Sequence, residues 1–466
     1  MKKLKKFKPT VMSSITLIII VLQTFLFWLT WYTVYNNNMV YSPFFKNGIV
    51  ILVLIYSVLL SAFSSLYGGY KIGYHRITDI ILSQIISLIF VNIITYLQVS
   101  LIDRRMLNPM AIIIMTIVQI LITIIWAYYS NKLYYKIFPP MKTIILYGNE
   151  NVSGLISKMN ERNDKYNIIG IKNVYDENIE ETLSELNKYD AVVIYDVKSS
   201  LRNEILKYCY IKSISIYITP KISDIIVSSS EKIHLFDTPL LLCKNKGLSF
   251  ERLFLKRIFD IIISTILIIL LSPVMLITAI AIKLNDKGPV IYKQKRLTRG
   301  DKLFNIYKFR SMIIDSEKNG QAILAKQDDN RITSVGKFIR KTRIDEIPQL
   351  FNVFMADMSF VGPRPERPEI ANHYIKSMPE FAYRTKVKAG LTGYAQIMGR
   401  YNTTPYDKLK LDMMYIQNYS IIEDIKLVLM TIKILFKEEH TEGISEQDLE
   451  KYFFSLENFE NEETNT

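Results

Sequence analysis

The chain has 466 residues, of which 49% are hydrophobic, and its formal net charge is +14. Residues 438–466 hold ten acidic side chains against a single lysine, which leaves residues 1–437 at +23. A basic body of this kind favours anionic lipid, phosphorylated small molecules or nucleic acid, and long uncharged stretches favour a membrane among these. The two cysteines lack metal-ligand spacing and are typical of ordinary thiols in a reducing compartment, and the four scattered histidines argue against a histidine metal site.

Four uncharged stretches come first in the chain, at 11–35, 49–67, 80–100 and 110–129. Each is close to the ~20 residues that a helix needs to cross a bilayer. Lysines before the first stretch, and basic residues after the second and the fourth, predict a cytoplasmic N-terminus and a cytoplasmic exit. Arg104 and Arg105 in the third loop argue weakly against this orientation. Residues 1–138 are therefore expected to form a bundle of four transmembrane helices.

Residues 139–247 predict a cytoplasmic Rossmann-like α/β domain. Apolar, β-branched runs at 142–149, 166–172, 190–197 and 213–219 are typical of a covered parallel sheet, and 178–188 has a helical pattern. A dinucleotide-binding turn requires Gly-x-Gly-x-x-Gly, whereas this chain has YGNENVSG, with Gly148, Gly154 and a repelling Glu150. We expect a degenerate version of the fold with a structural or regulatory role, and nucleotide binding stays open.

A fifth apolar stretch, at 258–282, contains Asp260 as its only charge and is long enough to cross the membrane. Basic residues flank both of its ends, which predicts that both ends are cytoplasmic. Ser272 and Pro273 interrupt the stretch, and an interior proline removes a hydrogen bond and bends a helix. We expect a re-entrant helix that breaks at these two residues and dips into one leaflet, with a straight span as the alternative.

Two adjacent carboxylates, Asp345 and Glu346, follow a basic run in the segment DNRITSVGKFIRKTRIDEIPQLFNVF at 329–354. Apolar residues recur there with helical spacing, and Pro348 is tolerated only in a first turn, so the pair is predicted at a helix start. The helix dipole favours negative charge there, and the simplest interpretation of Asp345 is a helix cap. Arg364, fixed between two prolines, is a rigid guanidinium that suits phosphate binding.

Seven blocks occur in order between residues 253 and 437: KRIFD…LSP (256–273), GPVIYKQKR (288–296), FNIYKFRSM (304–312), RITSVGKFIRKTRIDEIPQLFNV (331–353), DMSFVGPRPE (357–366), AGLTGYAQIMGR (389–400) and LDMMYIQNYSIIEDIKLVLMTI (411–432). Together they resemble the bacterial sugar transferases, which are monotopic polyprenyl-phosphate phosphoglycosyl transferases. The preceding helices and α/β unit look like those of long-form members that initiate capsule or exopolysaccharide. Ala356 stands where many members have glycine, which matters only if the backbone there has a positive φ.

The resemblance implies a mixed α/β phosphoglycosyl transferase domain at 248–437. This domain would transfer a sugar 1-phosphate, expected to be a hexose 1-phosphate, from a UDP-sugar to undecaprenyl phosphate and release UMP. Asp345 would be the nucleophile that forms an aspartyl-phosphosugar, and Glu346 its partner at Mg²⁺ or at a proton. Arg364, Arg340 and Arg400 would bind phosphate or substrate.

By the same resemblance the protein would be a multi-pass protein of the bacterial inner membrane, in contact with the lipid bilayer, with its catalytic domain in the cytoplasm. It would have no nucleic-acid partner, and a homodimer is left open. Asp412 is predicted either as a salt-bridge partner or as a site residue, the helix at 420–436 either on the membrane surface or in the core, and the tail at 438–466 as solvated.

The alternative function is a membrane regulator or scaffold of a polysaccharide assembly complex that senses nucleotides through residues 139–247. The intact set of Asp345, Glu346 and Arg364 disfavours it. The sequence specifies neither the sugar nor the final polysaccharide.

Overall fold

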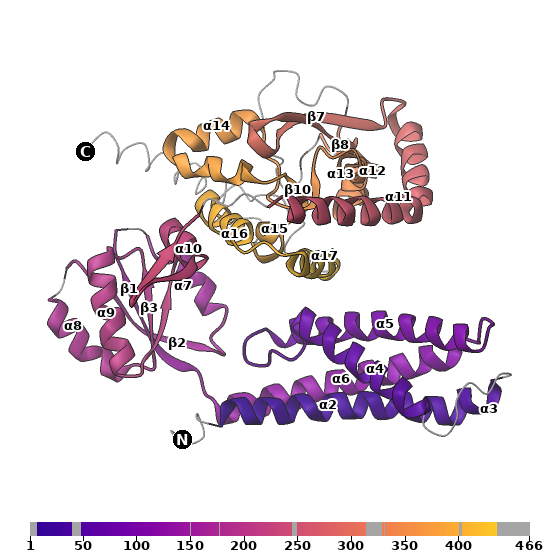
Figure 1. The fold of residues 1–466 in the computed structure, drawn as a ribbon, viewed down its shortest axis with the longest axis horizontal. Coiled ribbons are helices and arrows are strands. Elements are labelled where there is room, and N and C mark those ends of the chain that lie inside the picture. The colour runs from indigo at the N-terminus through magenta and orange to yellow at the C-terminus, as the bar shows by residue number, and fades with distance from the viewer. Residues whose placement is uncertain are drawn as a thin grey trace. The chain divides into compact units, whose positions relative to one another are not determined.

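The computed structural model describes residues 7–39, 48–149, 151–176, 178–244, 249–313, 329, 331–399 and 403–435 (Figure 1). Three of the features predicted above, Glu150, Arg400 and the acidic tail at 438–466, lie outside these residues. The chain divides into two compact units, Met1–Thr219 and Pro220–Thr466.

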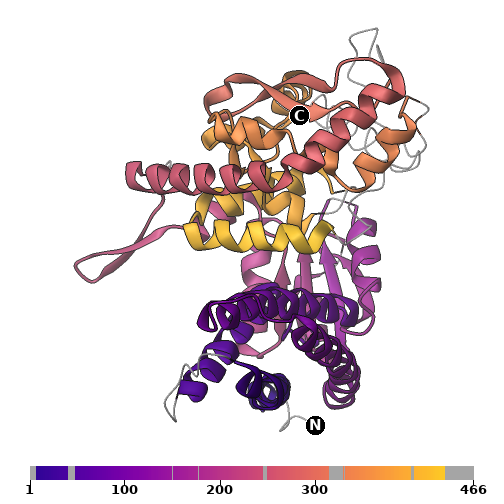
Figure 2. The same cartoon turned by 90° about the vertical axis from the view of Figure 1, so that its right-hand side faces the viewer.

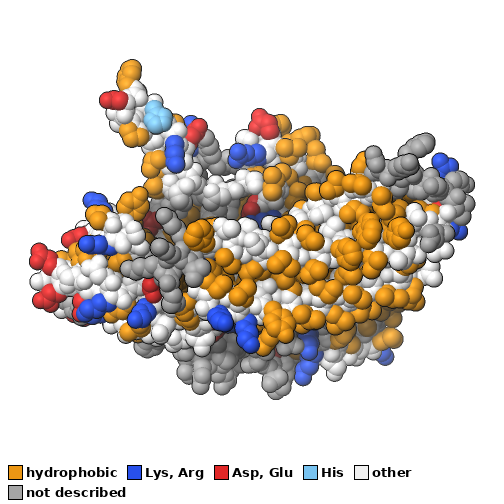
Figure 3. Space-filling view, turned by 90° about the horizontal axis from the view of Figure 1, so that it is seen from below, with side chains coloured by type: hydrophobic (Ala, Val, Ile, Leu, Met, Phe, Trp, Pro, Cys, Tyr) orange, Lys and Arg blue, Asp and Glu red, His pale blue; other side chains and the backbone are white. Residues whose placement is uncertain are grey.

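The first unit begins with long apolar helices: α2 (Lys8–Thr30), which continues through the π-helical turn η1 (Trp31–Tyr35) into α3 (Asn36–Asn38), then α4 (Gly48–Tyr67), α5 (Ile77–Ile102) and α6 (Met110–Ile137). The four uncharged stretches of the sequence all lie within them. These helices are long and apolar enough to cross a membrane. Figure 3 shows hydrophobic side chains over much of their visible face. Among the side chains of these helices, Leu17, Val21 and Ile114 are more than half exposed.

Polar side chains join these helices internally. The side-chain nitrogen of Gln119 donates to the Tyr56 hydroxyl (2.8 Å) and to the backbone oxygen of Gln23 (3.1 Å). Tyr56 donates to Asn92 (2.9 Å), and Asn92 donates to Gln119 (2.9 Å). The groups in these bonds come from α2, α4, α5 and α6, and the four residues are almost fully buried. Between helices with exposed apolar faces, such hydrogen bonds hold the helices in one register, because lipid-like surroundings offer no competing water.

The α/β part follows in the same unit, with β1 (Met141–Tyr147), α7 (Ser153–Asn160), β2 (Tyr166–Asn173), α8 (Ile179–Glu185), η2 (Leu186–Lys188), β3 (Ala191–Tyr195), α9 (Ser199–Ile211) and β4 (Ser215–Ile218). The four strands are parallel in the order β2-β1-β3-β4, which is a doubly wound arrangement. The core strands β1 and β3 are buried on both faces, as their continuous apolar runs predict.

The second unit begins with α10 (Ile222–Ser228) and a hairpin of β5 (Glu231–Leu235) and β6 (Thr238–Leu242). The α/β domain was expected to extend to residue 247, but the boundary between the units falls at 219/220. The physical reason is that Ile222 and Ile225 are buried in the main core of the second unit, together with Leu409 and Met413 of a later helix.

Helix α11 (Phe250–Asp286) contains Pro273, and Figures 1 and 2 show that it bends part-way along its length. Both of its ends are packed on the second unit. Near the end of the helix, Ile282 is buried with Phe309 and Ile339, and Asp286 pairs with Arg310. Between the two ends the helix exposes apolar side chains: Ile269, Leu270, Leu276 and Ile277 are each 64–68% exposed.

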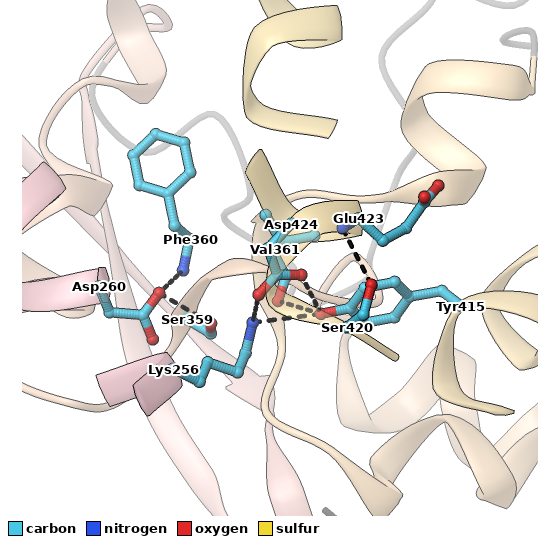
Figure 4. A network of polar contacts seen from close by, with 9 residues as sticks. All are labelled: Lys256, Asp260, Ser359, Phe360, Val361, Tyr415, Ser420, Glu423 and Asp424. Atoms are coloured by element: carbon cyan, nitrogen blue, oxygen red, sulfur yellow. Dashed lines mark hydrogen bonds and ion pairs between the residues drawn. The ribbon is translucent and has the colours of Figure 1, made fainter. Parts of the chain in front are cut away.

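The start of α11 is fixed by the buried polar network of Figure 4. Lys256 Nζ lies 2.6 Å from Asp424 Oδ2 and donates to the Tyr415 hydroxyl (3.1 Å). One turn later, Asp260 accepts hydrogen bonds from the Ser359 hydroxyl (3.0 Å) and from the backbone N–H of Phe360 (2.8 Å). Lys256 and Asp424 form an ion pair, and Asp260 is held by hydrogen bonds, as burial of charged groups requires.

The rest of the unit contains β7 (Ile291–Leu297), η3 (Arg299–Asp301), β8 (Leu303–Phe309), α12 (Ser334–Lys341), η4 (Ile344–Glu346), α13 (Gln349–Phe354), β9 (Ser359–Val361), α14 (Pro368–Ser377), η5 (Pro379–Lys386), β10 (Gly390–Thr392), α15 (Tyr394–Met398), α16 (Pro405–Gln417) and α17 (Ile421–Leu435). Strands β7 and β8 are antiparallel, and β9 and β10 are parallel. The backbones of Gly362 and Gly390 come so close that a Cβ on Gly390 would lie 2.0 Å from the Gly362 nitrogen. This contact fixes the start of the Pro-Arg-Pro loop.

Candidate active site

The paired carboxylates lie in a tight turn between two helices. Arg343 has a left-handed backbone (φ 56°), which ends α12 and turns the chain into η4. The turn is closed by 3₁₀ hydrogen bonds from Glu346 N to Arg343 O (3.2 Å) and from Ile347 N to Ile344 O (3.1 Å). The predicted helix start is therefore too early: α13 begins at Gln349, Pro348 is its cap residue, and Asp345 and Glu346 precede it. The spacing of the apolar residues suggested that the helix starts earlier, because a 3₁₀ turn also brings residues three positions apart to one side of the chain.

Glu346 is clamped by two cations. Lys308 Nζ and Arg364 Nη2 each lie 2.8 Å from the same carboxylate oxygen, Oε1. The Glu346 side chain is 17% exposed. Burial alone would raise the pKa of this carboxyl, but the charges of Lys308 and Arg364 outweigh burial and hold the pKa well below its usual range. Glu346 is therefore ionised at any physiological pH.

Asp345 has the opposite electrostatic balance. Burial, and then the negative charge of Glu346, raise its pKa to about 6, although Lys308, Arg340 and Arg364 oppose the change. At neutral pH the side chain is mainly a carboxylate, but one that is more basic than an ordinary aspartate. An anionic oxygen of raised basicity beside several cations is suited to attack an electrophile that carries negative charge itself.

A second arginine holds the loop that carries Arg364. Arg384 is 6% exposed, and its guanidinium donates to the backbone oxygen of Arg364 (3.1 Å) and to Asp412 Oδ2 (2.7 Å). From the other side, Arg296 Nη1 donates to the backbone oxygen of Pro365 (3.1 Å). Of the two roles predicted for Asp412, the structure places it as the buried partner of an arginine. Arg364 is thus fixed by its neighbours as well as by its two prolines.

The structure brings Asp345, Glu346 and Arg364 together as the sequence led us to expect. Arg340 lies in the last turn of α12, where its charge lowers the pKa of Asp345. Arg400 is outside the described residues. The upstream Arg331 pairs with Asp329 (2.5 Å).

Sequence reasoning missed Lys308 and Arg384. One signal for Lys308 was present. It lies two residues after the buried Ile306 in strand β8, so it shares the inward face, where a lysine requires a partner. Arg384 offered no comparable signal, because it lies in the irregular 3₁₀ segment η5.

The carboxylate pair fits a Mg²⁺ ion that a phosphorylated substrate shares. Within the described residues, no group of three or more His, Cys, Asp or Glu side chains is placed to hold a metal by itself. Mg²⁺ is usually bound by one or two carboxylates together with substrate phosphates and water. Asp345 and Glu346 supply two carboxylates, and these are the residues that would hold such an ion.

The edge of the α/β sheet where doubly wound folds bind nucleotides lies beyond β1 and β3. The Tyr175 hydroxyl accepts a hydrogen bond there from the backbone N–H of Lys198 (2.9 Å). A Cβ on Gly148 would lie 3.2 Å from the Tyr175 ring and 2.0 Å from the backbone oxygen of Asp196. In the described part of this edge, the Tyr175 ring and the backbone oxygen of Asp196 thus lie close against Gly148.

Comparison with known proteins places the chain in a family. Residues 251–438 match the family described as "Bacterial sugar transferase". A "UDP-glucose:undecaprenyl-phosphate glucose-1-phosphate transferase" of Caulobacter vibrioides is 37% identical over 190 residues, which are 40% of this chain and 71% of that protein. The chain belongs to the bacterial sugar transferase family.

Other relatives of this sugar transferase carry related names. A "UDP-N-acetylgalactosamine-undecaprenyl-phosphate N-acetylgalactosaminephosphotransferase" of Aeromonas hydrophila is 39% identical over 254 residues, 53% of this chain and 59% of that protein. A "UDP-glucose:undecaprenyl-phosphate glucose-1-phosphate transferase" of Klebsiella pneumoniae is 37% identical over 254 residues, 52% of this chain and 51% of that protein. The chain thus spans somewhat more than half the length of these two curated relatives. The matched family region contains Asp345, Glu346, Lys308 and Arg364.

Proposed function

We propose that this sugar transferase moves a hexose 1-phosphate from a UDP-sugar to undecaprenyl phosphate and releases UMP. The observation that carries the proposal is the clamp of Lys308 and Arg364 on Glu346, with the more basic carboxylate of Asp345 beside it. The relatives' names, which specify UDP-sugars and undecaprenyl phosphate, support the substrate classes. The reaction would be the first membrane step in the synthesis of capsule, exopolysaccharide or O-antigen.

The chemistry consists of two displacements at one phosphorus atom. A carboxylate oxygen of Asp345 attacks the β-phosphorus of the UDP-sugar, the bond to the bridging oxygen breaks, and UMP leaves with that electron pair. A phosphate oxygen of the acceptor lipid then attacks the same phosphorus, and Asp345 departs as a carboxylate. Lys308, Arg340 and Arg364 would offset the charge of the phosphates during both steps. When bound, Mg²⁺ would be held by Asp345 and Glu346 and would supply additional positive charge at the phosphates.

We infer further that α11 is re-entrant and that both of its ends lie on the cytoplasmic side. Its start is fixed to α17 by Lys256 and Asp424, and its end is fixed by Asp286 to Arg310, the residue that follows β8. Both partners belong to the same compact unit, and a helix that crossed the bilayer could not keep both attachments. The exposed apolar side chains between the two ends would then lie in one leaflet. This arrangement would hold Asp345 and Glu346 near the head group of a lipid substrate.

The test of the reaction is substitution of Asp345. We expect Asp345→Asn to abolish UMP release from UDP-sugars, because an amide cannot form the acyl phosphate. Glu346→Gln should lose activity by orders of magnitude. Intact-mass measurement after incubation with donor alone should find a phosphosugar adduct on the wild type and none on Asp345→Asn. A panel of UDP-sugars in the same assay identifies the sugar.

The matched control is Glu423→Gln, which removes a partly exposed carboxylate paired with Lys426 in α17. It should leave activity unchanged, because an i,i+3 ion pair between partly exposed side chains contributes little. An Asp345→Asn enzyme within tenfold of wild type would reject the covalent mechanism. If the wild type releases no UMP from any donor, the regulator or scaffold becomes the better proposal.

A further inference from the structure

A small pocket beside the clamped glutamate is lined by three cations, Arg296, Lys308 and Arg364, and by the side chain of Gln349. The described residues of its lining include no carboxylate. Arg296 and Arg364 are held by their neighbours, through bonds to the backbone of the Pro-Arg-Pro loop and to Glu346. A convergence of fixed cations around a small space is the usual chemistry of a phosphate site.

Gln349 is the unusual member of this lining. It is 3% exposed, and its side-chain nitrogen has no hydrogen-bond partner within the described residues. A buried donor without an acceptor destabilises a fold, so its presence requires an explanation. Asn352, three residues later in α13, provides the contrast: its amide nitrogen donates to Asn305 O (2.8 Å), and its amide oxygen accepts from Tyr307 N (2.9 Å). Within the described residues, both polar atoms of the Asn352 amide have partners, whereas the side-chain nitrogen of Gln349 has none.

We propose that Gln349 is a substrate-binding residue, whose side-chain N–H donates to a phosphate group held in this pocket by Arg296, Lys308 and Arg364. The inference rests on the proposed function. Neither Asp345 nor Glu346 lines the pocket. Asp345 attacks the phosphorus that carries the sugar. The phosphate bound in this pocket is therefore the second phosphate, which is joined to that phosphorus in the donor or in the product.

The UDP-sugar supplies this second phosphate in the first displacement, and the acceptor lipid supplies it in the second. In an in-line displacement the leaving group departs on the side opposite the attacking oxygen. The phosphate of UMP therefore leaves from the side opposite Asp345. In the second displacement Asp345 is the leaving group, so the phosphate of the acceptor lipid enters from that same side. One pocket then holds the UMP phosphate first and the polyprenyl phosphate second, and Gln349 contacts both.

The test uses the full-length protein in lipid nanodiscs and the variants Gln349→Met and Gln349→Glu. Methionine keeps the length of the side chain and removes the donor, and glutamate adds repulsion. We expect the Kd of UMP, measured by calorimetry, to rise roughly tenfold or more for Gln349→Met, because a hydrogen bond to a charged group is lost. The Kd of uridine should not change. The KM of a polyprenyl phosphate should rise in the same variant, with kcat much less affected.

Stability provides the second readout. Gln349→Met should keep or raise the melting temperature, because it removes an unpartnered donor. The control Asn352→Leu should lower the melting temperature and leave the Kd of UMP unchanged. If Gln349→Met changes only the Kd of UMP, or only the KM of the lipid, the pocket binds that substrate alone and the inference that it serves both is overturned. Unchanged affinity for both, in an enzyme that still releases UMP, overturns the inference and leaves the proposed function intact. A wild type that neither binds UMP nor releases it overturns the proposed function itself.

Discussion

Ala356 holds a backbone conformation that alanine adopts only at a cost. Its φ is 72°, at the turn between α13 and β9, and its carbonyl accepts a hydrogen bond from Lys388 Nζ (2.8 Å). A side chain in the left-handed region costs about 1–2 kcal/mol relative to the ordinary region, and glycine escapes this cost. The positive φ is a physical reason for the glycine that the family resemblance leads one to expect at this position, and it makes the alanine a source of strain in this chain.

We expect Ala356→Gly to stabilise the protein by about 1 kcal/mol, because the strain released exceeds the entropy that glycine adds to the unfolded chain. Chemical unfolding of the full-length protein measures the change. Ala371→Gly is the matched control, since Ala371 is buried inside α14 and glycine there should destabilise. Equal destabilisation by both variants would mean that the turn does not strain residue 356.

The active-site residues that the sequence predicted are those whose partners lie close along the chain or in a rigid motif. Asp345 and Glu346 are adjacent, and Arg364 is recognisable from its two prolines. Lys308 meets Glu346 across 38 residues, and Arg384 reaches the backbone of Arg364 across 20. Those contacts depend on how strand β8 and segment η5 pack, which no local pattern specifies. Gln349 could not be recognised either, because a missing partner is visible only in three dimensions.

At the scale of elements, regular periodicity was the reliable signal. The strands β1 to β4 and the long helices α4, α5 and α6 lie where alternating or continuous apolar runs predicted them. The error at the start of α13 arose where a 3₁₀ turn imitates helical spacing. The α/β domain was expected to end at residue 247, whereas the boundary between the compact units lies at 219/220. The difference arises because the short helix α10 packs on the core of the second unit, and the strands that precede it do not.

The bend of α11 provides a test at this scale. An interior proline disfavours a straight helix by about 3 kcal/mol. We expect Ser272→Ala with Pro273→Leu to favour a straight helix, to strain the attachments at its two ends and to remove most activity, although no site residue is altered. Pro273→Ala alone should give a partial loss. UMP release in nanodiscs, normalised to folded protein, measures both.

The control for these variants is Leu276→Ile, which changes an exposed apolar side chain of the same helix without altering the backbone. It should retain full activity. Full activity in the double variant, with residue 287 still cytoplasmic, would mean that the bend is set by the attachments at the ends rather than by Pro273.

The proposed topology of the whole molecule is open to chemical labelling. Cys209 is buried, and burial raises the pKa of its thiol to about 11, so it should react slowly near neutral pH. Cys243 is exposed and has to be replaced by serine. New cysteines at Glu251 and Lys287 then report the two ends of α11. Lys256 itself is unsuitable because it is only 5% exposed and paired with Asp424.

We expect an impermeant thiol reagent to label neither Glu251→Cys nor Lys287→Cys in intact cells, and to label both after permeabilisation, because both ends are attached to one unit. A cysteine introduced in the loop between α5 and α6, at Met106, should be labelled from outside and serves as the control. Labelling of Lys287→Cys alone from outside would identify α11 as a full span.

The partners of Lys256 and Asp260 are synthesised long after the helix that carries them. Asp424 follows Lys256 by 168 residues, and Phe360 follows Asp260 by 100. On the ribosome, the apolar part of α11 is therefore made while Lys256 and Asp260, near its start, still lack these partners. Those charges oppose passage through the bilayer. If α11 is re-entrant as proposed, the same two side chains that the second unit later buries would favour that topology before the unit has folded.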